Sequence, residues 1–196
     1  MQFLYHARSR QMRGQVLYPL SVLRTRFPDL YELERAKYGG REILFELRIP
    51  ILEVLWNEAL HLSPLHPSQL AAAWRAARLP PTAWDRDFFE IPVVRIESAR
   101  AVWFATGALD ENDPGRDQHP PSLPVDQVTR FDPAAYRAIR HPPAKYLEYL
   151  EDQRERGRRP RPFAYLPHVL VAAPIDVRNL DVVRAIQQPS NACSPP

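Results

Sequence analysis

The chain has 196 residues, of which 45% are hydrophobic and 25% are charged, a composition that predicts one folded domain and excludes a disordered chain. Its formal net charge of +3 does not by itself indicate a nucleic-acid partner, although the pI of about 9.2 is compatible with one. The only cysteine, Cys193, excludes a disulfide framework and a thiolate metal site within one chain, so no disulfide-linked partner is expected.

No stretch of the sequence approaches the run of about 18 apolar residues that a membrane span needs. Residues 1–13 carry three arginines after only a few apolar residues, which does not fit a secretory signal. We therefore expect a cytoplasmic protein without a membrane partner.

The first part of the chain predicts two short strands followed by two helices. Residues 3–6 and 16–18 are rich in aromatic and aliphatic side chains and are the strand candidates. Apolar residues at helical spacing predict a helix over 20–27, and a second helix over 29–38 follows Pro28.

The clearest strand pattern lies at residues 43–49, where apolar and polar side chains alternate up to Pro50. Apolar residues on one helical face then predict a short helix over 52–59. The alanine-rich segment 69–78 predicts a further helix, with Ser68 as its N-cap.

Residues 88–96 and 101–106 predict two strands that are neighbours in a sheet. Between 107 and 127 the sequence has four prolines and no periodicity, which is typical of a long loop. The remaining expected elements are a helix starting at residue 132, a helix over 143–156, and strands over 163–165, 168–172 and 180–183.

Strands at both ends of the chain, with helices between them, predict the fold class. We expect an α+β fold in which residues 1–186 form a single domain with a mixed sheet and helices packed on it. Residues 187–196 are expected to form a disordered tail.

Familiar catalytic signatures are absent from the sequence. There is no P-loop and no GxGxxG, HExxH or GxSxG motif, and six glycines leave little room for a phosphate-binding glycine loop. His61 and His66 are separated by a stretch with a proline, and their spacing fits neither helical nor strand metal ligation. No metal site is therefore predicted.

The basic residues are nearly all arginine, and five of them form the densest charge cluster: Arg154, Arg156, Arg158, Arg159 and Arg161. Arginine is well suited to bidentate contact with phosphate, so this cluster is a candidate for contact with a nucleic-acid backbone. The alternative is a solvated helix C-terminus, where the helix dipole favours cations. No aromatic residues are interleaved with the cluster, which argues against stacking on single-stranded bases.

Five short stretches occur in an informative order: residues 4–6 (Leu-Tyr-His), Arg41, residues 61–67, residues 102–107 and residues 168–171. This order resembles the ADP-ribosyltransferase fold, particularly its DNA-targeting toxin branch. Members of that branch open with a Tyr-His strand, carry a central arginine and end with an acidic residue before an apolar strand. The resemblance spans most of the chain.

The resemblance implies NAD, or a related nucleotide, as a cofactor. Tyr5 and His6 would hold NAD, and Arg41 would neutralise its pyrophosphate. The loop over 107–127 or the arginine cluster would contact the acceptor.

The resemblance also defines the catalytic candidates, which are His6, His168 and Glu90. His168 occupies the position of the family's catalytic glutamate, and a histidine cannot supply negative charge against an oxocarbenium-like transition state. Either Glu90 replaces that acid or the chain is a non-catalytic relative.

A non-enzymatic interaction protein is the rival hypothesis, motivated by the missing glutamate and the scarcity of glycine. It predicts an exposed apolar or arginine-rich patch instead of a deep polar pocket. The enzyme hypothesis predicts that His6, Arg41 and residues 61–67 converge on one cleft.

Overall fold

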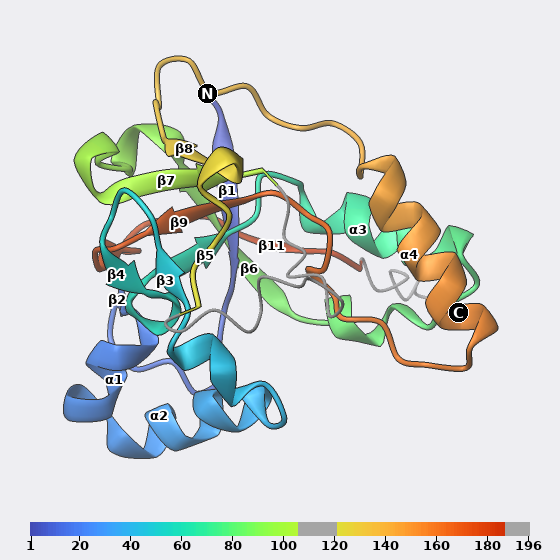
Figure 1. Cartoon of the computed structure of the whole chain (residues 1–196), viewed down its shortest axis with the longest axis horizontal. Helices are drawn as coiled ribbons and strands as arrows, with labels where there is room; N and C mark the ends of the chain where they lie inside the picture. Colours follow the sequence, from blue (N-terminus) through green and yellow to red (C-terminus); the bar gives the residue numbers. More distant parts are fainter. Residues whose placement is uncertain (106–120, 187–196) are drawn as a thin grey trace, which may run out of the picture.

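Two antiparallel sheets form the centre of the computed structural model, which describes residues 1–105 and 121–186 (Figure 1). The first sheet has the order β1 (Phe3–Ala7), β6 (Asp87–Pro92), β11 (Val182–Arg184). The second has the order β5 (Leu60–Leu62), β9 (His168–Val171), β7 (Ala101–Phe104), β8 (Val128–Arg130). An antiparallel bridge between Tyr5 and Ser63, with two backbone hydrogen bonds of 2.8 Å, joins β1 to the end of β5.

Two short strand pairs complete the β-structure: β2 (Val16–Leu17) with β10 (Ile175–Asp176), and β3 (Arg48–Ile49) with β4 (Val54–Leu55). The α+β fold class is confirmed. Every strand ladder among the described residues is antiparallel, whereas a mixed sheet was expected; the only parallel contact described is an isolated bridge between Arg48 and Ser122. Strands from both ends of the chain were expected in the sheet. This is confirmed, because β1 and β11 both pair with β6.

Four α-helices lie around these sheets: α1 (Leu20–Arg26), α2 (Pro28–Arg35), α3 (Pro67–Ala76) and α4 (Ala144–Glu155). Figure 1 shows α1 and α2 together at one end of the molecule and α3 and α4 together at the other. Among the described residues, no helix is both long and apolar enough to cross a membrane. Short 3-10 helices lie at η1 (Ala36–Tyr38), η2 (Glu42–Phe45), η3 (Trp56–Glu58), η4 (Pro81–Trp84), η5 (Val93–Arg95), η6 (Ser98–Arg100) and η8 (Val125–Gln127).

All four helices were expected, but the cap of α3 was not. His66, rather than Ser68, is the N-cap, and its side chain accepts a hydrogen bond from the Ser68 backbone N–H. Pro67 then occupies the first helical position, where its missing N–H and fixed φ suit a helix start.

The predicted strand over 43–49 is wrong. Residues 42–45 form η2, and only β3, at the end of the segment, is extended. A strand needs a partner for its backbone groups, and β3 pairs with β4 over two residues only. The alternating pattern is instead accounted for by partial burial, with Phe45 packed against the Tyr38 ring at 5.3 Å between centroids.

The predicted helix over 52–59 is also wrong. Ile51 and Glu53 have φ angles of 71° and 55°, which no α-helix can contain, and the chain then forms β4 and η3. The backbone N–H of Trp56 bonds to the Leu47 carbonyl at 2.8 Å, so this segment folds back as a tight connection.

Strands β6 and β7 are not neighbours, contrary to the prediction for 88–96 and 101–106. The 3-10 turns η5 and η6 lie between them and carry the chain from the first sheet to the second. The expected helix at residue 132 and the expected strand over 163–165 are turns. The loop predicted from 107 falls largely, and the tail over 187–196 wholly, outside the described residues.

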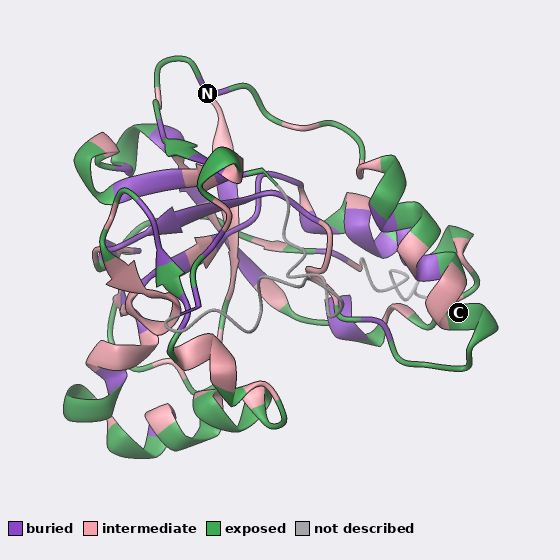
Figure 2. Cartoon of the chain, in the orientation of Figure 1, coloured by how far each residue is buried: buried purple, intermediate pink, exposed green. Residues whose placement is uncertain are grey.

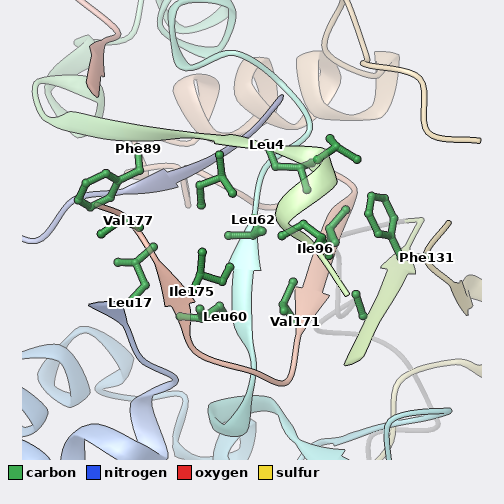
Figure 3. Packing of buried hydrophobic residues seen from close by; sticks show 14 of the residues in the cluster. Leu4, Leu17, Leu60, Leu62, Phe89, Ile96, Phe131, Val171, Ile175 and Val177 are labelled. Atoms are coloured by element: carbon green, nitrogen blue, oxygen red, sulfur yellow. The ribbon is translucent and has the colours of Figure 1, made fainter. Parts of the chain in front are cut away.

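The largest buried cluster packs side chains from both sheets against one another and supports a single domain. Figure 3 shows Leu4 of β1, Leu62 of β5 and Val171 of β9 in this cluster, together with Leu17 and Ile175. Figure 2 shows β7 and β9 as mostly buried, whereas α1 and α2 are mostly exposed or partly buried.

A second cluster packs α3 and α4 against β6. The Trp74 indole N–H donates to the Tyr146 hydroxyl at 2.8 Å, a bond between two buried side chains that ties α3 to α4.

Candidate functional site

His6 and His61 are brought together where β1 and β5 lie side by side. The His6 Nδ1 atom lies 3.0 Å from the His61 carbonyl oxygen, and the His61 Nε2 atom lies 3.0 Å from the Trp56 carbonyl oxygen. The rings of Trp56 and His61 pack edge to face with centroids 4.1 Å apart. Side chains from β1 of the first sheet, β5 of the second sheet and the turn η3 are therefore in contact with one another.

Hydrogen bonds to carbonyl groups define the tautomers of these histidines. A carbonyl oxygen can only accept, so His6 carries its hydrogen on Nδ1 and His61 carries it on Nε2. His168 likewise donates from Nδ1 to the Leu166 carbonyl at 2.9 Å. The Nε2 atom of His6 is then an unprotonated hydrogen-bond acceptor.

All three histidines are held in the neutral form. Burial lowers the pKa of His6. Burial, followed by the repulsion that a protonated His61 would meet from a protonated His168, lowers the pKa of His61 to about 3, and burial lowers the pKa of His168 to about 4. The His61 and His168 rings lie 6.4 Å apart, and His168 is only 6% exposed.

Tyr38 and Arg41 are also part of this group. Burial raises the pKa of the Tyr38 hydroxyl, and a polar interaction with the Trp56 side chain opposes part of that shift. The Arg41 guanidinium lies 5.5 Å from the centre of the Tyr38 ring and donates to the Lys37 carbonyl at 2.6 Å. Among the described residues Arg41 has no carboxylate partner.

The carboxylate that acts electrostatically on His6 is that of Glu34, at the end of α2. Glu34 accepts a hydrogen bond of 3.0 Å from the Ser9 hydroxyl and forms an ion pair with Lys37. Glu34 raises and Lys37 lowers the pKa of His6, although burial outweighs both effects.

Tyr5 and Glu90 lie on the opposite face of the first sheet from His6. Tyr5 pairs with Glu90 and His6 pairs with Phe89, and successive strand residues point to opposite faces. The Tyr5 hydroxyl donates to Glu90 at 3.1 Å, and the His66 ring meets the Tyr5 ring at 4.9 Å. Burial and the Glu90 carboxylate raise the pKa of Tyr5.

The predicted site residues therefore separate into two groups. His6, Arg41 and His61 belong to one series of contacts with His168 beside it, whereas Tyr5 and Glu90 belong to another, beside a cavity of about 270 Å³ that Tyr5 and His66 help to line. The five predicted arginines lie on and after the end of α4.

Sequence reasoning missed three members of the His6 group: Glu34, Tyr38 and Trp56. None of them belongs to a recognisable motif, and each lies in a different element, α2, η1 or η3, from the strand β1 that holds His6. The aromatic and histidine members of the group are separated by up to 55 positions in the sequence, from His6 to His61. No local sequence pattern could therefore reveal the group.

In the part of the chain that the structure describes, no group of three or more His, Cys, Asp or Glu side chains is placed to hold a metal ion. No protein-family model, curated protein or solved structure matches the chain. Function is therefore inferred from the geometry of these residues.

Proposed function

We propose that this chain is an ADP-ribosyltransferase-like domain that binds NAD or a related nucleotide. The binding site is the NAD cluster, which we define as His6, Tyr38, Arg41, Trp56 and His61. A single observation carries the proposal: contacts join His6 to His61 and His61 to Trp56, Trp56 acts on the Tyr38 hydroxyl, and the Arg41 guanidinium lies against the Tyr38 ring.

The chemistry of these side chains suits a dinucleotide. Trp56 and Tyr38 offer aromatic surface for a base or a nicotinamide ring. The Nε2 atom of His6 can accept a hydrogen bond from a ribose hydroxyl. Arg41 and the nearby Lys37 supply positive charge for a pyrophosphate, and Arg41 is the better suited because it has no carboxylate partner among the described residues.

Transfer of an ADP-ribosyl group needs negative charge near the ribose, because the bond to nicotinamide breaks with oxocarbenium character. His168 is neutral, and Glu90 lies on the other face of the first sheet. Glu34 is the carboxylate that acts on His6. The catalytic form of the proposal therefore assigns the acidic role to Glu34, and the non-catalytic form retains NAD binding alone.

NAD binding measured by calorimetry tests the proposal. His6→Ala and Arg41→Ala should each weaken binding by about ten-fold or more, because each removes a polar contact to the ligand. The matched controls are His141→Ala and Arg24→Ala, which remove exposed residues outside the NAD cluster and should leave binding unchanged. Wild-type protein that releases no heat with NAD would overturn the proposal.

The second candidate is a non-enzymatic protein that contacts a nucleic-acid backbone through the arginine cluster. It is favoured by the exposure of all five arginines, from Arg154 to Arg161. Binding of nucleic acid without any binding of NAD would favour this alternative.

A further inference from the structure

A groove of about 450 Å³ lies between the C-terminal ends of α3 and α4, which Figure 1 shows side by side. The groove is distinct from the NAD cluster, with which it shares no residue. Its volume lies within the range of small-molecule sites in proteins, roughly 300 to 1,000 Å³. The end of α4 and the residues after it contribute Arg154, Arg158 and Arg159 to the lining, and the segment after α3 contributes Leu79, Pro80 and Thr82.

Both lining segments are shaped by the way the two helices end. Arg78, with φ of 58°, and Gly157, with φ of 62°, take the left-handed conformation just beyond α3 and α4. The Leu79 N–H then bonds to the Trp74 carbonyl, and the Arg158 N–H bonds to the Gln153 carbonyl, each at 2.8 Å. These are Schellman endings, in which backbone groups already satisfy carbonyls of the last helical turn.

The arginine side chains of the groove make few interactions with the rest of the described protein. Among the described residues, the side chains of Arg158 and Arg159 have neither an ion pair nor a hydrogen bond, and both residues are exposed. Arg154 pairs only with the next residue along the chain. A role in capping α4 therefore does not account for the two arginines that follow the helix.

Other cations add to the positive potential near the groove. Burial lowers the pKa of Arg86, Glu34 opposes that shift, and the charges of Arg10 and Arg159 lower the pKa further. Arg10 and Arg159 therefore both lie within electrostatic range of Arg86, and Glu34 offsets part of this positive charge.

We propose that this groove binds the phosphate group of a phosphate ester. The guanidinium forks of Arg158 and Arg159 match phosphate geometry, and Thr82, which lines the same groove, offers a hydroxyl donor. Leu79 and Pro80 supply apolar surface for the organic part of the ligand. The phosphate belongs either to a free organic phosphate or to a nucleotide chain, and this site does not depend on the proposed binding of NAD.

Calorimetry with three probes tests the site: inorganic phosphate, ribose 5-phosphate and a ten-nucleotide single-stranded DNA. The test variant is Arg158→Gln with Arg159→Gln. The matched control is Arg13→Gln with Arg178→Gln, which removes the same charge from two exposed, ion-paired arginines outside the groove and outside the arginine cluster. All substituted side chains are exposed, and a melting curve of each variant verifies folding.

Binding of ribose 5-phosphate that falls by about ten-fold or more in the test variant, but not in the control, supports the proposal with a free phosphate ester as ligand. The same pattern with DNA alone supports it with a nucleotide chain as the source. Absence of binding for all three probes, or equal weakening in both variants, overturns it. Arg41→Ala should leave ribose 5-phosphate binding unchanged, so failure here and failure of NAD binding are distinguishable.

Discussion

His6, His61 and His168 show how single residues in this fold depend on their surroundings. Each donates one ring hydrogen to a backbone carbonyl, and each has a pKa lowered by burial. The folded state therefore binds fewer protons than the unfolded state between the unfolded pKa of about 6.5 and the lowered folded values. Stability is fully present above pH 6.5 and is lost as the pH falls toward 4.

This linkage predicts a pH dependence of unfolding. Between pH 7 and pH 5, His61 and His168 together should lower the free energy of unfolding by roughly 3 kcal/mol. Urea unfolding at several pH values measures the loss. His168→Asn keeps a donor for the Leu166 carbonyl but cannot titrate, so about half of the loss should disappear; an unchanged slope would contradict the assignment.

Helices α3 and α4 show how elements are held to one another. Their main polar link is the bond from Trp74 to Tyr146, whose hydroxyl also donates to the Pro162 carbonyl at 3.0 Å. Both side chains are buried, so the loss of the hydroxyl would leave an indole N–H and a carbonyl without their partner.

Tyr146→Phe should therefore lower the free energy of unfolding by about 1 to 3 kcal/mol. Chemical denaturation measures this value. Tyr149→Phe is the matched control, because its hydroxyl accepts a bond from the exposed Arg161 N–H and its loss should cost less than about 1 kcal/mol. Equal losses of stability for the two substitutions would contradict the prediction that the buried Tyr146 hydroxyl contributes more than the Tyr149 hydroxyl.

At the scale of the whole molecule, the two sheets share one hydrophobic core. β1 belongs to the first sheet, and the Tyr5 to Ser63 bridge attaches it to the second. Leu4 is fully buried in the cluster that receives side chains from both sheets, as Figure 3 shows. We therefore expect the described fold to unfold as one cooperative unit.

Leu4→Ala should cost about 2 to 5 kcal/mol, because it removes buried methyl groups and leaves a cavity between the sheets. Far-ultraviolet circular dichroism and tryptophan fluorescence should report the same single transition. Leu33→Ala, at a position 40% exposed on α2, should change stability by less than about 0.5 kcal/mol. Two separate transitions in the wild-type protein would contradict the single core.

The sequence predicts part of the candidate site and misses the rest for a physical reason. His6, Arg41 and His61 are found because short motifs in a given order point to them. Trp56 and Tyr38 are not found, because the first lies in a segment predicted as a helix and the second at the end of one. Their roles depend on contacts between elements far apart in sequence.

By itself, the sequence determined the features that depend on local interactions. Apolar spacing and prolines identify α1 to α4, the order of expected strands and helices identifies the α+β class, and charge density identifies the arginines after α4. Only the tertiary structure decided which strands pair, that Tyr5 and Glu90 lie on the face opposite His6, and that the ends of α3 and α4 enclose a groove. Strand pairing joins backbone groups that are distant along the chain, so one strand's pattern cannot specify its partner.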